Sequence, residues 1–309
     1  MAAFVWLHAW YEALARVLAV INDKGGVGKT STVANLAGQL ALAGYRVLVI
    51  DLNRQANLAD DLGYRKKPDV DDDGAGLVMA LTMGVPLTPV KGIRPNLDLV
   101  PGGTKLAMLT AFVISEMQQH GRSVYGALAA ALAPIAGDYD VVLIDTPPEN
   151  MVLGDLALAC ARWAILPTKS DPGGLVGMQL TADRFEAARE FNPYLRLLGV
   201  VLFGTLSGAG KIHKEVRGEV EEAFGGASPL FDATIRHSER VARDCRKRGL
   251  LAHELEPMDP AAEEALREAM SAGRRRRPPI SQSVSADYAA LAAEVLELLA
   301  AGEAAEVGV

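Results

Sequence analysis

The stretch VLAVINDKGGVGKTSTVANLAGQLALAGYRVLVID, residues 17–51, decides the fold class of this 309-residue chain. It begins with a short apolar run, passes through a cluster of glycines and continues as a helical pattern. Gly44 ends that pattern, and a second apolar run follows. We therefore expect a strand at 17–22, a helix at 29–43 and a strand at 46–51, which together form a βαβ unit with a right-handed crossover.

Further apolar runs have the length and composition of buried strands. They lie at 97–100, 141–145, 163–167 and 198–203. Helical patterns separate them, such as those at 123–136 and 177–191. Alternation of helices with strands that have no polar face predicts an α/β fold, a doubly wound and mostly parallel sheet with helices on both faces. Half of the residues are hydrophobic, so a chain of this length can bury a sizeable core.

The glycine-rich loop KGGVGKT at 24–30 lies between the first strand and the first helix, where a phosphate cradle belongs. Glycines let the backbone approach closely, successive N–H groups point inward, and the helix N-terminus favours an anion. The alternative is a glycine turn with an accidental Gly-Lys-Thr, and the flanking strand and helix argue against it. The residues expected to contact a nucleotide are Lys24, Gly25, Gly26, Val27, Gly28, Lys29, Thr30 and Ser31.

Side chains of this loop have specific tasks in such a cradle. Lys29 would reach the β- and γ-phosphates of a nucleotide, and the Thr30 hydroxyl would ligate Mg²⁺. The loop also begins with a second lysine, Lys24, and the pattern K-G-G-x-G-K-[ST] resembles the deviant Walker A signature of the ParA/MinD superfamily. The resemblance implies a ParA-type partitioning ATPase that binds ATP and Mg²⁺. It also implies that Lys24 reaches across an ATP-dependent homodimer to the nucleotide of the other chain.

Two more segments resemble nucleotide motifs of the same superfamily. The run YDVVLIDTPPE at 139–149 resembles its Walker B strand, which ends here in Asp145. Residues 47–63 resemble its switch segment, usually D-L-D-P-Q-G-N, with Asn53 in place of the second aspartate. That aspartate helps to orient the attacking water, and an amide cannot act as a base. The resemblance implies a metal-binding set of Thr30, Asp51 and Asp145 and a catalytic set of Lys24, Lys29, Asp51 and Asn53.

A basic cluster, RHSERVARDCRKR, lies at 236–248. The spacing of Arg240, Arg243 and Lys247 lets one helical face present all three side chains. Charge alone indicates a solvated surface, whereas the resemblance favours sequence-independent contact with the phosphates of double-stranded DNA. The four arginines at 274–277 either extend this patch or belong to a solvated linker. The DNA-binding candidates are Arg236, Arg240, Arg243, Arg246, Lys247 and Arg248.

We expect the chain to divide into an N-terminal helical extension at 1–16 and an ATPase domain at 17–309. Apolar residues near helical spacing in the extension, interrupted by charges, favour a short packing helix over a membrane anchor. Within the domain, 66–76 has the composition of a polar loop. Residues 271–285 have that of a flexible Arg/Pro-rich connector, and a closing helix follows at 286–301.

The resemblance implies a dimerising, DNA-binding ATPase of plasmid or chromosome partitioning, stimulated by a ParB-like partner and associated with the nucleoid in the cytoplasm. The formal net charge of −7 argues against coating of nucleic acid by the whole surface, but it allows a local basic patch. Only two cysteines occur, Cys160 and Cys245. Their positions do not suit an iron–sulfur reductase of the same fold or a disulfide framework.

Two alternative functions share the phosphate loop. A MinD-like membrane-cycling ATPase would need a basic amphipathic C-terminal helix, whereas residues 294–309 contain glutamates and no lysine or arginine. An ATP-gated DNA-binding switch that hydrolyses very slowly is the second alternative, because Asn53 replaces the usual aspartate.

Overall fold

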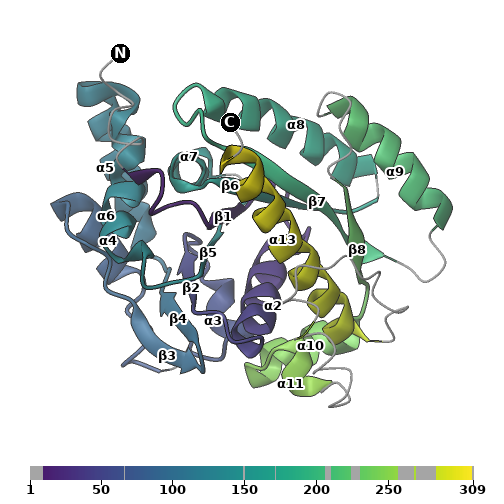
Figure 1. Cartoon of the computed structure of the whole chain (residues 1–309). Helices are drawn as coiled ribbons and strands as arrows, with labels where there is room; N and C mark the ends of the chain where they lie inside the picture. Colours follow the sequence, from purple (N-terminus) through teal and green to yellow (C-terminus); the bar gives the residue numbers. More distant parts are fainter. Residues whose placement is uncertain are drawn as a thin grey trace.

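The computed structural model describes residues 10–65, 67–148, 150–170, 172–205, 210–223, 230–256, 268 and 283–307. Over these residues the strands form one sheet in the order β3-β4-β2-β5-β1-β6-β7-β8 (Figure 1). The β3–β4 pair is antiparallel, and every other pair of neighbouring strands in this order is parallel. The strands are β1 (Val17–Val20), β2 (Val47–Asp51), β3 (Val90–Arg94), β4 (Leu97–Val100), β5 (Val141–Asp145), β6 (Trp163–Thr168), β7 (Arg196–Thr205) and β8 (Leu230–Arg236). The expected mostly parallel sheet is confirmed.

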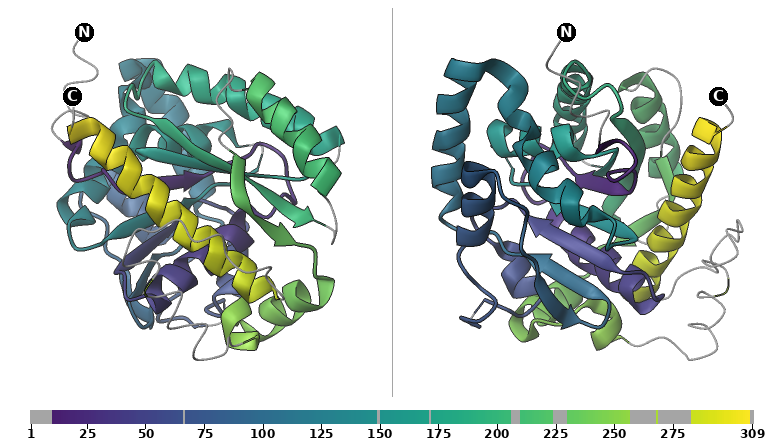
Figure 2. Two further views of the ribbon diagram at one scale, coloured as in Figure 1. Left: turned by 45° about the vertical axis from the view of Figure 1, so that its right-hand side comes forward. Right: turned by 60° about the vertical axis from the view of Figure 1, so that its left-hand side comes forward.

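Helices cover both faces of the sheet, as the two turned views in Figure 2 show. One face carries α2 (Lys29–Leu42), α3 (Asn57–Asp61), α10 (Glu239–Arg248), α11 (Ala252–Leu255) and α13 (Val284–Val307). The other face carries α4 (Ala75–Met83), α5 (Leu106–His120), the 3-10 helix η2 (Gly121–Gly126), α6 (Ala127–Ala136), α7 (Met151–Cys160), α8 (Pro172–Arg189) and α9 (Gly210–Ala223). The fold is therefore doubly wound.

The central strands are apolar at every position because both of their faces are covered. In β1, Leu18 and Val20 pack into the core beneath α2 and α13, whereas Val17 and Ala19 pack into the core beneath α5 to α8. All four of these side chains are almost completely buried. This two-sided burial is what makes a parallel strand appear as an uninterrupted hydrophobic run in the sequence.

The strands expected at 97–100 and 141–145 have those bounds in the structure, and the other expected strands differ by one or two residues at one or both ends. Two strands were not expected. β3 is an edge strand without a buried residue, and β8 is the strand at the opposite edge. β3 has only exposed and half-buried residues, and the exposed Asp232 interrupts the buried residues of β8, so neither sequence has the apolar run that marks a central strand.

β1 occupies the position at which the direction of winding changes. The chain leaves β1 for β2 on one side of it, and later crosses from β5 to β6 on its other side. The carboxyl ends of β1, β2 and β5 therefore meet at one edge of the sheet. Ligands of doubly wound proteins bind at this switch point.

The described end of the N-terminal extension packs onto the domain. Residues 11–16 form turns that lead into β1, and Leu14 is buried in the core beneath α5 to α8. The Trp163 indole donates to the Ala15 carbonyl over 2.9 Å, and Arg16 pairs with Glu303 of α13 over 2.6 Å. The extension expected at 1–16 is continuous with the domain over this part, and its first nine residues lie outside the described ranges.

The closing helix α13 is longer than expected, because it starts at Val284 and ends at Val307. Most of the expected connector at 271–285 lies outside the described residues, including the four arginines at 274–277. In the expected loop at 66–76, residues 67–74 lack regular helix or strand, and α4 begins at Ala75.

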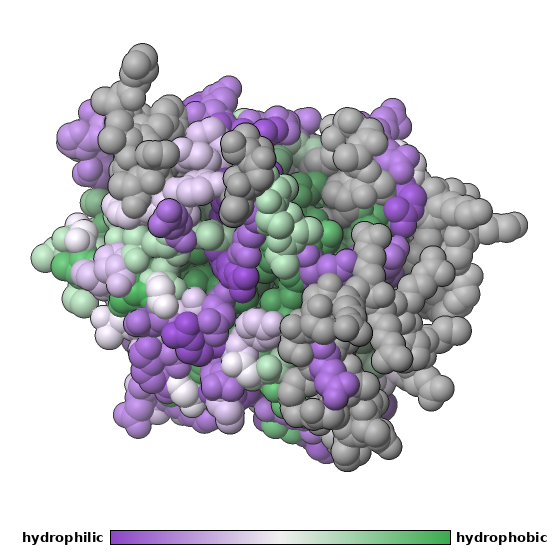
Figure 3. Space-filling model, in the orientation of Figure 1, coloured by the Kyte–Doolittle hydropathy of each residue, from purple (hydrophilic) through white to green (hydrophobic). Residues whose placement is uncertain are grey.

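The surface over the described residues is mixed. Figure 3 shows hydrophilic residues scattered among apolar ones over the face seen in Figure 1, with apolar residues gathered at its left side, where α4 lies. Met79 and Met83 of α4 are among the exposed apolar side chains. None of the described helices is both long enough and apolar enough to span a membrane.

Candidate functional site

The glycine-rich loop connects β1 to α2 at the carboxyl edge of the sheet. Gly28 lies just before the first residue of α2 with a φ of 89°, in the left-handed region that favours glycine. A Cβ at this position would also lie 2.4 Å from the ring of Phe203, so space and backbone geometry both require glycine. The N-terminus of a 14-residue helix is thus open toward the loop, as an anion site needs.

The two lysines of the loop lie close to each other. Lys29 is 6% exposed, and its Nζ donates to the carbonyl oxygen of Lys24 over 2.9 Å. Lys24 itself is half-buried, whereas Gly25 and Gly26 are exposed. The Lys29 side chain is therefore oriented within the loop by the backbone carbonyl of Lys24.

Asn22, which sequence analysis did not single out, attaches the start of the loop to β6. Its side-chain nitrogen donates to the Pro167 carbonyl over 2.9 Å, and its side-chain oxygen accepts from the Lys24 N–H over 2.8 Å. Asn22 is completely buried. A polar residue directly after an apolar strand is the signal that could have identified it.

Two carboxylates lie side by side beneath the loop. Asp51 ends β2, Asp145 ends β5, and the two are paired in the parallel register of these strands. Both are completely buried, and the Thr30 hydroxyl donates to Oδ2 of Asp145 over 2.8 Å. The expected metal-binding set is thus brought together, with its carboxylates on neighbouring strands.

The carboxylates retain unused oxygens. Oδ1 of Asp51 accepts from the Asn53 N–H over 2.8 Å, but Oδ2 of Asp51 and Oδ1 of Asp145 have no hydrogen-bond partner among the described residues. Burial and the neighbouring Asp145 raise the pKa of Asp51 well above its usual range. Burial raises the pKa of Asp145 to about 7, against the lowering effect of the Thr30 hydrogen bond. Such buried carboxylates with free oxygens fit a hard divalent cation, which would relieve their repulsion.

The switch segment follows Asp51 and is held in a tight turn. Oδ1 of Asn53 accepts from the Gln55 N–H over 2.9 Å, and Asn53 is 3% exposed. Gly102, two residues after β4, lies so close that a Cβ there would be 2.6 Å from the Asp51 carbonyl oxygen. Ala56 has a φ of 47°, and the Arg65 guanidinium binds its carbonyl over 2.6 Å. The segment containing Asn53 is therefore held in one conformation by contacts from two sides.

The basic cluster lies partly on α10, and it is not a single free surface. Arg236 pairs with Asp287 of α13 over 2.7 Å. Arg246 pairs with the buried carboxylate of Asp61 over 3.0 Å, and the same carboxylate accepts from the hydroxyl of Ser31 over 3.3 Å. Two of the six candidates thus pair with buried carboxylates of α3 and α13, and Arg246 is joined through Asp61 to the helix that begins in the phosphate loop.

The remaining candidates are exposed on α10. Arg240 and Arg243 have 70% and 79% of their side chains exposed, although each also contacts an acidic neighbour. Lys247 and Arg248 are exposed as well. The expected helical face of Arg240, Arg243 and Lys247 is therefore present and open to solvent.

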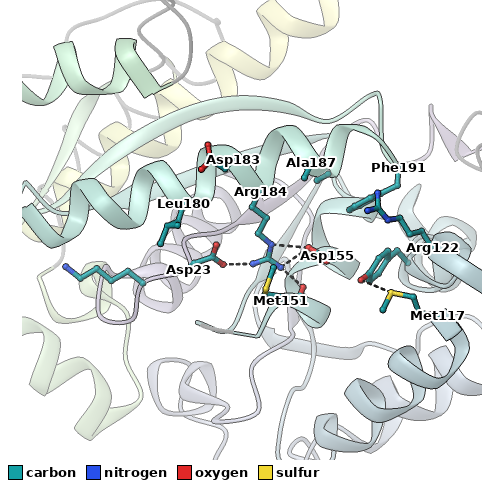
Figure 4. A pocket seen from close by; sticks show the side chains of 13 residues that line it. Asp23, Met117, Arg122, Met151, Asp155, Leu180, Asp183, Arg184, Ala187 and Phe191 are labelled. Atoms are coloured by element: carbon teal, nitrogen blue, oxygen red, sulfur yellow. Dashed lines mark hydrogen bonds and ion pairs between the residues drawn. The ribbon is translucent and has the colours of Figure 1, made fainter.

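A hollow of about 880 Å³ opens beside the phosphate loop. Asp23 and Lys24 line it from the loop, Leu180 and Arg184 line it from α8, and Phe191 lines it from the turn after α8 (Figure 4). In this hollow, the Arg184 side chain contacts both the phosphate loop and α7. The hollow is thus continuous with the start of the candidate nucleotide site.

Comparison with known proteins identifies the family. A family model described as "AAA domain" matches residues 15–197, which span the phosphate loop and both buried carboxylates. The chain is 32% identical to the chromosome-partitioning ATPase Soj of Thermus thermophilus, over 75% of this chain and 85% of Soj. This chain belongs to the ParA/MinD superfamily of P-loop ATPases.

Other proteins agree with this assignment. The ATPase is 34% identical to the chromosome partitioning protein ParA of Caulobacter vibrioides, over 74% of this chain and 82% of that protein. A solved structure named cobyrinic acid a,c-diamide synthase of Mycobacterium smegmatis, with bound ATP analog and magnesium, matches with a TM-score of 0.62 and 29% identity. That match covers 76% of this chain and 92% of the other.

Proposed function

We propose that this ATPase binds ATP with Mg²⁺ at residues 24–31, dimerises on ATP, and moves DNA in plasmid or chromosome partitioning. The observation that carries the proposal is the meeting of Lys29, Thr30 and the two buried carboxylates at one edge of the sheet. Two relatives, Soj and ParA, are named for chromosome partitioning. Lys29, Thr30 and the two carboxylates would take part directly in nucleotide binding, metal binding and hydrolysis.

Thr30, Asp51 and Asp145 would hold Mg²⁺, since each presents an oxygen at this edge and two carboxylate oxygens have no other partner among the described residues. Held there, the cation would supply positive charge that partly neutralises the phosphate groups of ATP. The Mycobacterium smegmatis structure contains an ATP analog with magnesium, which supports the same pair of ligands here.

The side chains of the chain itself would bind and orient the nucleotide. Lys29 donates to a neutral carbonyl in the structure described here, and a charged phosphate oxygen is a stronger acceptor. Asn53 has used one lone pair of its amide oxygen on Gln55, and the second could accept from the attacking water. We infer that Asn53 positions this water without removing its proton, so turnover is slow.

Dimerisation on ATP would place Lys24 of each chain at the nucleotide of the other. The position of Lys24 supports this proposal, because it is half-buried at the outer side of the loop and is followed by the exposed Gly25 and Gly26. A second chain could approach the loop from that side. This role of Lys24 rests on the family resemblance, and the open side of the loop is compatible with it.

DNA would bind to the α10 patch, which we define as Arg240, Arg243, Lys247 and Arg248. These side chains are exposed together on one helix, and cations at such a spacing suit phosphates rather than base edges. A ParB-like partner would stimulate hydrolysis and release the DNA. A MinD-like membrane role is less suitable, because α13 packs against α2 and β8 and has no basic residue in its last turn.

The test is steady-state phosphate release from ATP, with and without plasmid DNA, for the native protein and for Asn53→Asp. The aspartate can keep the hydrogen bond to Gln55 and adds a base, so we expect turnover to rise by about tenfold or more. DNA-stimulated turnover in the native protein supports a partitioning cycle. Turnover only in Asn53→Asp would instead support the alternative function, an ATP-gated DNA-binding switch.

A further inference from the structure

An arginine of α8 contacts the residue that precedes Lys24. Arg184 is 8% exposed, and its Nη1 donates to Oδ1 of Asp23, the first loop residue after Asn22. The backbone N–H of Asp23 donates to the hydroxyl of Thr181 over 3.2 Å. Thr181 and Arg184 are three residues apart, so one face of α8 contacts both the main chain and the side chain of Asp23.

The same guanidinium is held on its other side by α7. Its Nε and Nη2 donate to Oδ1 of Asp155 over 3.0 and 2.9 Å, and Nη2 also donates to the Met151 carbonyl. Gly154 leaves the room for this arrangement, since a Cβ there would lie 2.3 Å from Nη2. Figure 4 shows the guanidinium between the carboxylates of Asp23 and Asp155. Every nitrogen of Arg184 is therefore occupied.

This arrangement restricts the segment that leads into the P-loop. A buried arginine with hydrogen bonds at each nitrogen has a fixed side-chain geometry, so Asp23 is fixed with it. Lys24 follows Asp23 directly and is also held by Asn22 through its N–H. Contacts from α7 and α8 thus set the direction in which the Lys24 side chain leaves the loop. Both helices lie outside the predicted nucleotide-binding residues.

We propose that Arg184 is a positioning residue, which acts through Asp23 to hold Lys24 in the conformation that engages the nucleotide of the second chain. This inference rests on the proposed ATP-dependent dimer. It requires that loss of the Arg184–Asp23 contact weakens dimerisation on ATP without weakening binding of ADP to the P-loop of the same chain. Misplacement of a group by about 1 Å can lower its effect about 100-fold.

The test compares Asp23→Ala with Asp183→Ala. Asp183 lines the same hollow, is exposed, and points away from Arg184 (Figure 4), so its replacement removes the same charge from the same region. We measure dimerisation with a non-hydrolysable ATP analog, ADP affinity, and hydrogen exchange of the amides at 23–26. We expect Asp23→Ala to weaken dimerisation by about tenfold or more and to speed exchange, with ADP affinity unchanged and Asp183→Ala like the native protein.

Two further variants separate the possible outcomes. Arg184→Gln combined with Asp23→Ala should dimerise no worse than Arg184→Gln alone, because the two residues act as one unit. Lys24→Ala tests the proposed dimer itself. Faster exchange in Asp23→Ala together with native dimerisation of Lys24→Ala would support the positioning of the loop but refute the role of Lys24 in the other chain. If exchange and dimerisation in Asp23→Ala match those of Asp183→Ala, the role of Arg184 is refuted, even where Arg184→Gln fails to fold.

Discussion

At the residue scale, Asp51 and Asp145 occupy positions that cost stability in the absence of a cation. Both are buried on adjacent strands, and their unused oxygens face no partner among the residues that the structure describes. Desolvation of two neighbouring carboxylates is unfavourable unless a positive charge lies between them. Functional sites often carry such destabilising arrangements, which are relieved when the ligand binds.

We therefore expect Asp51→Asn to raise the free energy of unfolding of the nucleotide-free protein by on the order of 2 kcal/mol. The same substitution should remove most of the stabilisation that Mg²⁺ and ATP give to the native protein. Urea unfolding at pH 8, with and without Mg²⁺ and ATP, measures both effects. Asp69→Asn is the control, because that carboxylate is exposed and should change neither quantity. Lower stability of Asp51→Asn without ligand would contradict this account of the site.

At the element scale, α10 carries two kinds of basic residue. The cations of the α10 patch are exposed, and Arg246, whose side chain is 54% exposed, pairs with the buried Asp61 at the end of α3. Burial raises the pKa of Asp61, while Arg246 lowers it. The two kinds of basic residue should therefore respond differently to mutation.

Replacement of Arg240, Arg243 and Lys247 by alanine should weaken retention on plasmid DNA at low salt. It should leave ATP affinity and the free energy of unfolding nearly unchanged, because exposed ion pairs contribute little. Arg246→Ala should instead lower the free energy of unfolding by about 2 kcal/mol, since it leaves Asp61 without its cation. DNA retention against salt and urea unfolding test the pair of expectations. Native DNA binding in the triple variant would remove α10 from the proposed interface.

The ends of α3 and α10 meet through glycine. Gly249 follows α10 with a φ of 64°, and a Cβ on it would lie 2.3 Å from the Cα of Gly63. Arg94 spans the junction by donating to the carbonyl oxygens of Leu62 and Gly249 over 3.1 and 3.0 Å. The backbone that follows α3 is thus in direct contact with the backbone that follows α10.

Gly249→Ala should lower the free energy of unfolding by about 2 to 4 kcal/mol, because the methyl group overlaps backbone and the left-handed conformation is strained. Gly218→Ala is the matched control. Gly218 lies within α9 with nothing within 4 Å of a Cβ, and alanine there should be neutral or stabilising by up to about 1 kcal/mol. Thermal and urea unfolding give the comparison, and equal behaviour of the two variants would show that the junction can relax.

At the scale of the whole molecule, ligand binding and dimerisation should both appear in the unfolding temperature. A ligand that binds only the folded state stabilises it by about 2.7 kcal/mol at 100 times its dissociation constant. With Mg²⁺ and a non-hydrolysable ATP analog, the unfolding temperature should also rise with protein concentration, because the dimer adds a concentration-dependent term. Lys29→Ala should show neither effect. A ligand-induced shift that does not depend on protein concentration would support ATP binding and contradict the dimer.

Elements with local sequence signals could be predicted before the structure was known. The apolar runs of the central strands predicted the fold class, and the glycines, lysines and threonine of the phosphate loop predicted a candidate nucleotide site after the first strand. These signals are readable because a turn needs particular residues at fixed spacing, and because a strand buried on both faces must be apolar throughout.

The pairing of charged side chains, in contrast, became visible in the folded chain. Arg246 and Asp61 are 185 residues apart, and Arg184 and Asp23 are 161 residues apart. No periodic pattern connects such positions, so Arg246 could not be distinguished from its exposed neighbours, and Arg184 could not be assigned to the loop. The edge strands β3 and β8 also required the structure, because β3 has no buried residue and polar residues interrupt the buried ones of β8. Sequence patterns report local geometry and burial, whereas the partner of a buried charge depends on the way in which the whole chain packs.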